Sequence, residues 1–291
     1  SDARSVELIE VGPRDGLQNE ARPVSLDDKL ALINRLVEAG FRRIEATSFV
    51  SPTAIPQLAD ADDLMPGLPK HLDVDYICLV PNTRGYDRAM VAGVRHVEVF
   101  TAATDTFCQA NTRCTIDESF ERFAPIMERA TVDSVTVRGA VSVAFHCPYS
   151  GPVEPEAAVA VAERLLAIGC SEVSIADTIG RASPGEVERL LELALRRLPT
   201  DRVAMHFHDT TGQAIENIRV SWDAGISRFD SSVGGLGGCP FAPGAPGNVA
   251  SESVVHAFEK MNVSTGIDLD SLTATATWIR NVLGKDEHAP H

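Results

Sequence analysis

Positive charge is scarce in this sequence. Its 291 residues include 26 Lys and Arg against 41 Asp and Glu, which gives a formal net charge of −15. A protein that binds nucleic acid gathers Lys and Arg into a basic patch, and the sequence has none. We therefore expect no nucleic-acid partner. A polyanionic ligand would need a local group of Arg or Lys side chains, because the overall charge of the chain repels it.

Long apolar runs and paired cysteines are lacking as well. No segment is long enough to span a membrane, and the first ten residues have the pattern of a strand, not of a signal peptide. The six cysteines are scattered and form no Cys-x-x-Cys pair, which argues against a disulfide framework and for a reducing compartment. These absences predict no membrane partner and a cytoplasmic location.

Short β-branched runs alternate with longer helical patterns along the chain. Eight runs are predicted to be strands: Val6–Val11, Arg43–Ala46, Asp75–Leu79, His96–Phe100, Val135–Val143, Glu172–Ala176, Val203–Phe207 and Arg228–Ser232. Eight strand–helix units favour an α/β fold, a (β/α)₈ TIM barrel with a C-terminal helical extension. An open doubly wound sheet is the alternative, but no Gly-x-Gly-x-x-Gly follows the first strand. We expect a single domain, with the barrel at about residues 6–261 and the last helix at about residues 268–283.

The predicted helices have recognisable ends. They cover Leu26–Ala39, Thr83–Ala92, Ile116–Ala130, Pro155–Ile168, Pro184–Leu198, Thr211–Ala224 and Ser251–Met261, with a less regular stretch at Thr53–Leu64. Ser25 and Ser183 can each cap the helix that follows. Four glycines stand where a left-handed residue ends a helix: Gly40, Gly93, Gly169 and Gly225.

Unusual polar residues follow several of the predicted strands. They occur in Gly12-Pro13-Arg14-Asp15, Ile44-Glu45, Ala176-Asp177-Thr178 and His206-Phe207-His208-Asp209. In a parallel barrel the C-terminal ends of the strands share one rim, where active sites lie. We therefore expect these side chains to meet at a single site.

His206 and His208 are two residues apart on a strand, so they face the same side. Two imidazoles in one cavity are ready metal ligands, although two histidines satisfied by hydrogen bonds would have the same spacing. Asp15 adds a carboxylate on the same rim. A mixed set of ligands of this kind suits Mg²⁺ or Mn²⁺, and could also take Zn²⁺ or Fe²⁺. Arg14, next to Asp15, could stabilise an enolate oxygen.

The glycine-rich segment Ser232–Asn248 follows the last strand. Its glycines favour movement and its prolines limit it, as in a lid over an active site. Cys239 in this segment could act as an acid/base or a nucleophile, or be an incidental residue of a flexible connector. The glycine N–H groups could instead bind phosphate, although the Gly-Lys-Ser/Thr of a P-loop is absent.

Several long motifs occur in order through the chain. They are Val11–Glu20, Ile44–Pro52, Cys147–Tyr149, Ala176–Gly180, His206–Thr210, and Gly234–Pro240 with Gly247–Glu252. Together they resemble the signature segments of the 3-hydroxy-3-methylglutaryl-CoA lyase family, from about Val6 to about Leu283. The wider group contains metal-dependent barrel lyases and acyl-condensing enzymes.

The resemblance implies a role for each matched residue. The implied ligands of the divalent cation, Mg²⁺ or Mn²⁺, are Asp15, His206, His208 and Asn248. Arg14 would face the thioester oxygen, and Cys239 would be the acid/base of the lid. The residues implied to orient ligands and proton-transfer groups are Glu45, Asp177 and Glu252. Those implied to contact the substrate or support the site are Gln18, Arg138, Thr178 and Glu252.

The implied reaction is the cleavage of 3-hydroxy-3-methylglutaryl-CoA into acetyl-CoA and acetoacetate. A cation on the C3 hydroxyl lowers its pKa, and the C2–C3 bond then breaks by a retro-Claisen step. The residue that takes the hydroxyl proton stays open among Asp177, His206 and Glu45. The partners that we expect are an acyl-CoA substrate and further copies of this chain, in a dimer or a tetramer.

Two positions depart from the family pattern. Relatives carry a tyrosine where this chain has Ala140, and often a glycine where it has His146. Arg138 and Ala140 share a face of one strand, so an inward Ala140 would enlarge the acyl pocket unless a neighbour such as Phe145 fills the space.

Other readings of the reaction therefore remain. One alternative substrate is a citramalyl-CoA-like thioester or one with a longer 3-substituent. Another reading is an enzyme that condenses acetyl-CoA with a 2-oxo acid. The intact polar rim disfavours a non-catalytic binding protein on the same scaffold.

Overall fold

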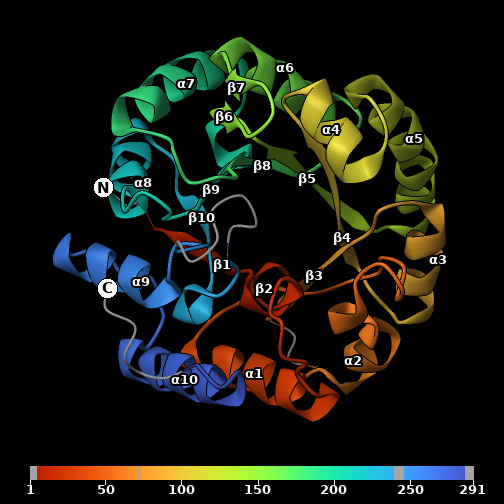
Figure 1. Cartoon of the computed structure of the whole chain (residues 1–291), viewed down its shortest axis with the longest axis vertical. Helices are drawn as coiled ribbons and strands as arrows, with labels where there is room; N and C mark the ends of the chain where they lie inside the picture. Colours follow the sequence, from red (N-terminus) through yellow and green to blue (C-terminus); the bar gives the residue numbers. More distant parts are fainter. Residues whose placement is uncertain (1–4, 71–72, 239–245, 286–291) are drawn as a thin grey trace.

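The computed structural model describes residues 5–70, 73–238 and 246–285. Within these ranges eight strands close into a parallel barrel, in the spatial order β1-β10-β9-β8-β5-β4-β3-β2. Figure 1 shows the helices as a ring around the strands. The predicted (β/α)₈ TIM barrel is confirmed, and closure of the barrel excludes the open doubly wound sheet.

The barrel strands agree with the eight predicted runs to within two residues at each end. They are β1 (Glu7–Glu10), β2 (Arg43–Ser48), β3 (Asp75–Leu79), β4 (His96–Ala102), β5 (Thr136–Ser142), β8 (Glu172–Asp177), β9 (Val203–Phe207) and β10 (Arg228–Ser231). A short antiparallel hairpin after β5 is formed by β6 (His146–Cys147) and β7 (Gly151–Pro152). The agreement is close because buried parallel strands form compact apolar runs that turn residues separate.

The helices are α1 (Leu26–Ala39), α2 (Ala61–Gly67), α3 (Thr83–Val91), α4 (Asp105–Thr112), α5 (Ile116–Asp133), α6 (Pro155–Ala167), α7 (Pro184–Arg197), α8 (Ala214–Ala224), α9 (Ser251–Lys260) and α10 (Leu269–Val282). Short helical turns are η1 (Gly12–Gly16), η2 (Pro56–Leu58), η3 (Thr200–Arg202) and η4 (Val233–Gly235). In the ranges that the structure describes, none of these helices combines the length and the apolar content needed to cross a bilayer.

Local signals explain most of the helix ends. Ser25 and Ser183 accept hydrogen bonds from the first turns of α1 and α7, as predicted. The four glycines expected to end helices have positive φ: Gly40, Gly93, Gly169 and Gly225. Helix α4 was not predicted, because eight residues are too few for a clear apolar period, although Thr104 caps its start.

The C-terminal extension packs beside the first helix of the barrel. Helix α10 lies along α1, and the Asp268 N–H donates to the Ala39 carbonyl at 2.8 Å (Figure 1). Leu272, Ala276 and Ile279 of α10 are buried in the main core. The extension therefore completes the helical ring on that side.

Strand β5 illustrates how the side chains divide between the two faces. Val137 and Val141 join the core beneath the helices, while Arg138 and Ala140 face the barrel interior. Gly139 also faces the helices, and a Cβ there would lie 2.9 Å from Leu165 Cδ1 of α6. Glycine therefore lets α6 approach the strand that carries Arg138 and Ala140.

Candidate active site

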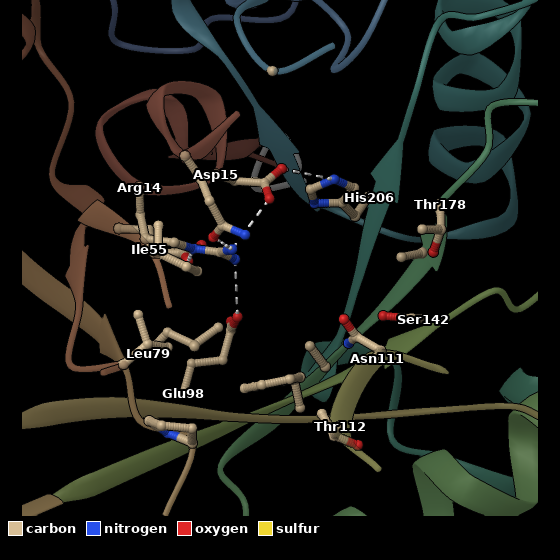
Figure 2. A pocket seen from close by; sticks show the side chains of 18 of the residues that line it. Arg14, Asp15, Ile55, Leu79, Glu98, Asn111, Thr112, Ser142, Thr178 and His206 are labelled. Carbon is tan, nitrogen blue, oxygen red and sulfur yellow. Dashed lines mark hydrogen bonds and ion pairs between the residues drawn. The ribbon is translucent and has the colours of Figure 1, made fainter. Parts of the chain in front are cut away.

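A cavity of about 750 Å³ lies at the C-terminal ends of the barrel strands. Figure 2 shows Arg14 on the opposite side of it from Thr178, Ser142 and Asn111, with Asp15 and His206 between them. Most of the polar side chains that the sequence placed on one rim thus converge on one space. Those that line it are Arg14, Asp15, Gln18, Glu45, Thr178, His206 and His208.

The loop after β1 positions Arg14 and Asp15. It forms one π-helical turn, η1, with Pro13 near its start. Glu10 accepts hydrogen bonds from the N–H groups of Gly12 at 2.8 Å and Val233 at 2.9 Å. It thereby ties η1 to the turn η4, which begins the glycine-rich segment.

Asp15, His206 and His208 form a compact cluster. One potential ligand atom from each lies within 4.8 Å of the other two. Asp230 Oδ2 accepts a hydrogen bond from His206 Nδ1 at 3.0 Å, which leaves His206 Nε2 facing Asp15 at 3.8 Å. The Asn248 amide group donates to Asp15 Oδ2 at 2.8 Å. The cluster is a possible site for a divalent cation.

The protonation states of Asp15 and His208 fit a cation. Burial lowers the pKa of His206, but Asp230 and Asp15 raise it above its ordinary value, so a cation would have to displace that proton. Burial is the largest effect on Asp15 and raises its pKa, but the charges of Arg14 and the two histidines lower it to about 2. Burial, helped by His206, lowers the pKa of His208 to about 4, so this imidazole is neutral. The buried His208 Nδ1 has no hydrogen-bond partner among the described residues. A neutral imidazole with an unpartnered nitrogen and an ionised carboxylate are both in the states that metal ligands need.

Carboxylates hold Arg14 on the side of the cavity. Its Nε donates to Glu45, and its Nη1 donates to Asp15 Oδ1 at 3.1 Å and to Gln18 Oε1 at 3.2 Å. Glu98 Oε1 lies 3.8 Å from Arg14 Nη2. Burial lowers the pKa of Arg14, but these carboxylates raise it above its ordinary value. Arg14 therefore presents a fixed positive charge to the cavity.

The remaining residues from the implied roles lie in different places. The Thr178 hydroxyl accepts a hydrogen bond from the Val143 N–H at 2.7 Å, at the wall of the cavity. Glu252 accepts from the Gly234 N–H at 2.8 Å and is not among the lining residues. Cys239 lies outside the described residues.

Asp177 does not line the cavity with the other candidate proton-transfer groups. Its neighbour Ala176 lines the cavity, so Asp177 at the end of β8 faces the other way. Its carboxylate accepts hydrogen bonds from the N–H groups of Arg181 at 3.1 Å and Ala182 at 3.0 Å. Asp177 therefore shapes the loop after β8 and does not reach the cavity.

Arg138 and His146 lie outside the residues that line the cavity. Arg138 is fully buried and does not line the cavity, so the structure gives it no route to contact a substrate. His146 Nε2 lies 2.8 Å from Glu186 Oε1 at the start of α7, away from the acyl pocket that it was expected to reshape. Ala140 does line the cavity. Phe145 packs against Phe207, with ring centroids 6.5 Å apart, and does not fill the space beside Ala140.

Several residues at the site were missed in the sequence. Phe107, Asn111 and Thr112 reach the cavity from α4, the helix that was not predicted. Glu98 and Asp230 sit within apolar strand runs, and each contacts a residue of the site. A lone carboxylate in a buried strand was the available signal, since such a group needs a partner.

Comparisons with known proteins agree on one family. The model of the family described as HMGL-like matches residues 5–279. The chain is 47% identical to hydroxymethylglutaryl-CoA lyase of Pseudomonas mevalonii, over 97% of this chain and 93% of that protein. It is 46% identical to the 3-hydroxy-3-isohexenylglutaryl-CoA/hydroxy-methylglutaryl-CoA lyase of Pseudomonas aeruginosa, over 97% and 94%. An HMG-CoA lyase of Acinetobacter baumannii, solved with coenzyme A and 3-methylmalate, superposes with a TM-score of 0.92 at 38% identity, over 97% and 92%.

Proposed function

The chain belongs to the HMGL-like family and is a carbon–carbon lyase, and on this premise we propose that it cleaves 3-hydroxy-3-methylglutaryl-CoA into acetyl-CoA and acetoacetate. The observation that carries the proposal is the fixed Arg14 guanidinium beside the cluster of Asp15, His206 and His208 in one cavity. The complex of the Acinetobacter baumannii lyase with coenzyme A and 3-methylmalate supports an acyl-CoA substrate.

The proposed cation is Mg²⁺ or Mn²⁺, held by Asp15, His206, His208 and the amide oxygen of Asn248. A bound divalent cation supplies Lewis-acid chemistry, which makes an alcohol more acidic. The neutral His208 and the ionised Asp15 are in the states that such ligands need.

Arg14 is the residue proposed to stabilise the enolate. When the C2–C3 bond breaks, its electron pair moves to C2 and negative charge spreads to the thioester oxygen. A guanidinium already held by Glu45, Asp15 and Gln18 needs no rearrangement to meet that charge. The stabilisation that Arg14 provides therefore increases as the C2–C3 bond breaks.

Of the candidate acceptors of the hydroxyl proton, His206 and Glu45 line the cavity. His206 Nδ1 already donates to Asp230 and its Nε2 is proposed to hold the cation, so Glu45 is the proposed acceptor. Burial and the neighbouring Glu98 raise the pKa of Glu45, although Arg14 opposes them, so Glu45 is more basic than an ordinary carboxylate. Cys239 is proposed as the acid/base of the lid because its segment matches the family motif.

A second candidate substrate is a CoA thioester with a longer or more polar group at C3, including a citramalyl-CoA-like compound. Ala140 lines the cavity, so the wall carries a small side chain at this position. The name of the Pseudomonas aeruginosa relative supports a large C3 substituent within this family.

The proposal extends to the organisation of the protein. It is a single lyase domain, with the barrel at about residues 6–261 and the last helix at about residues 268–283, and it acts as a dimer or a tetramer in the cytoplasm. The five cysteines that the structure describes are free thiols, which supports a reducing compartment. Light scattering after size-exclusion chromatography tests the oligomeric state.

A substrate panel tests the activity. The protein is incubated with several 3-hydroxyacyl-CoAs and Mg²⁺ or Mn²⁺, and acetyl-CoA release is quantified. The proposal requires release from 3-hydroxy-3-methylglutaryl-CoA or from an analogue with a larger C3 group. Release from none of them by folded protein would leave a non-catalytic binding protein, and formation of the C–C bond from acetyl-CoA and a 2-oxo acid would favour a condensing enzyme.

A further inference from the structure

Arg138 lies in the barrel interior, beneath the cavity, and contacts three carboxylates. Its Nε donates to Glu172 Oε1 at 2.7 Å, its Nη1 to Glu98 Oε2 at 2.9 Å and its Nη2 to Asp230 Oδ1 at 2.6 Å. The three acids come from β8, β4 and β10, and Arg138 is fully buried. Only a planar guanidinium offers donors in three fixed directions at this spacing.

One branch of this network leads to a proposed metal ligand. The second oxygen of Asp230 accepts from His206 Nδ1 at 3.0 Å and from the Ser174 hydroxyl at 2.8 Å. These bonds set the direction in which the other ring nitrogen of His206 faces. Histidine ligands in proteins are commonly oriented by such a carboxylate, and loss of that partner weakens metal binding.

The other branch leads to the residue proposed for the enolate. Glu98 Oε2 accepts a hydrogen bond from Arg138, and Glu98 Oε1 lies 3.8 Å from Arg14 Nη2. Glu98 is buried, and a buried carboxylate needs a charged or hydrogen-bonding partner. Arg138 is therefore the common member of the two branches, Arg138–Asp230–His206 and Arg138–Glu98–Arg14.

We infer that Arg138 is a positioning residue that sets His206 and Arg14 at the same time, without touching the substrate. The inference deepens the proposed function, on which its metal-binding arm rests. Removing the guanidinium leaves Asp230 and Glu98 as buried carboxylates that have lost a shared partner. Each then loses the contact that fixes its position, and both branches lose their geometry.

Arg43 provides a matched control. It also donates to Glu172, from Nη2 at 2.7 Å, but its other partners Glu7 and Asp75 start β1 and β3 at the opposite end of the barrel. Arg43→Gln therefore removes one partly buried positive charge and two hydrogen bonds to Glu172, and it leaves the contacts of both branches in place.

The experiment compares Arg138→Gln, Arg43→Gln and the isosteric variants Asp230→Asn and Glu98→Gln. The affinity for Mn²⁺ is measured by calorimetry on the metal-free proteins, and kcat and KM are measured with the substrate that the panel identifies. We expect Arg138→Gln and Asp230→Asn to weaken Mn²⁺ binding by roughly 10–100-fold, and Arg43→Gln to leave it unchanged. Glu98→Gln should keep the Mn²⁺ affinity and lower kcat, because it disturbs only the branch to Arg14.

Pairing the changes tests the branch itself. If Arg138 acts on His206 through Asp230, the double variant Arg138→Gln/Asp230→Asn should bind Mn²⁺ about as well as either single variant, because the effects of residues in contact are not additive. If Arg138→Gln does not fold, Asp230→Asn and Glu98→Gln test the two branches separately. Asp230→Asn should weaken Mn²⁺ binding, and Glu98→Gln should lower kcat.

Metal-free crystal structures separate this inference from the proposed function. Arg138→Gln should displace His206 and Arg14, whereas Arg43→Gln should not. Unmoved side chains together with wild-type Mn²⁺ affinity in Arg138→Gln would overturn the inference. A wild-type protein that binds no Mn²⁺ would instead overturn the proposed metal site, and the positions of His206 and Arg14 would still decide the role of Arg138.

Discussion

Replacing Arg14 with lysine tests the proposed chemistry most directly. Lysine keeps the positive charge but has a single ammonium group in place of the planar fork. In the structure that fork meets Glu45, Asp15 and Gln18 from different nitrogens. A flexible ammonium cannot satisfy these partners and face the thioester oxygen in a fixed direction.

The loss should appear in kcat. Charge on the thioester oxygen develops only as the C2–C3 bond breaks, so the Arg14 guanidinium stabilises the transition state more than the bound substrate. Removing one donor to a developing oxyanion costs about 10²–10³ in kcat, or about 2.7–4 kcal/mol. We expect Arg14→Lys to lose activity on this scale, with KM within about threefold of wild type.

The assay measures steady-state kcat and KM with 3-hydroxy-3-methylglutaryl-CoA, with circular dichroism to verify folding. Arg122→Lys is the matched control, since Arg122 also lines the cavity but is exposed and donates only to the Thr112 carbonyl in the described contacts. Its kcat should stay close to wild type. A raised KM with normal kcat in Arg14→Lys would show that Arg14 only binds substrate, and an equal loss in both variants would refute its special role.

Four further predictions follow from the site. EDTA should abolish cleavage and Mg²⁺ or Mn²⁺ should restore it, while Asp15→Ala should stay inactive at saturating metal; full activity after rigorous metal removal would refute the metal role. Alkylation should inactivate the enzyme through Cys239 with protection by substrate. Peptide mapping must exclude Cys147, whose burial raises its pKa but whose hydroxyl and backbone partners lower it to about 7. Ala140→Tyr should shift the ratio of kcat/KM values toward the methyl substrate over one with a larger C3 group, and an unmoved ratio would remove Ala140 from specificity. Burial raises the pKa of Glu10 to about 8. Between the ordinary pKa of a glutamate and about 8, the folded state keeps a proton that the unfolded state has released, so the free energy of unfolding falls as the pH rises through this range. Urea unfolding should thus show Glu10→Gln gaining stability relative to wild type between about pH 5 and pH 9, and parallel pH profiles would contradict this.

Local patterns in the sequence predicted the barrel well. The strand β3 and the helix α1 have the predicted bounds, because each is an apolar run or stripe ended by a clear turn or cap. Helix α4 was missed because it is short, and three cavity-lining residues were missed with it. The predictions were therefore most accurate where the local apolar pattern was long and its ends were clearly marked.

The direction in which a side chain faces was harder to predict at the strand ends. The motif of residues 176–178 predicted a site residue at Asp177, yet its neighbours Ala176 and Thr178 line the cavity and Asp177 faces the loop after β8. Successive side chains of a strand face opposite sides, so a prediction that is wrong by one residue places a side chain on the wrong face. His146 is similar, since its contact with Glu186 depends on how the β6–β7 hairpin meets α7.

The sequence by itself determined that eight strands alternate with helices, that polar motifs follow the strands, and that these motifs match one family. Only the tertiary structure decided which of those groups meet. Arg138 contacts acids that lie 34, 40 and 92 residues away along the chain, on three other strands. Periodicity reports the environment of neighbouring residues, whereas these contacts depend on barrel closure and on the register between strands. The partners of the charges buried in the interior are therefore set by closure of the barrel.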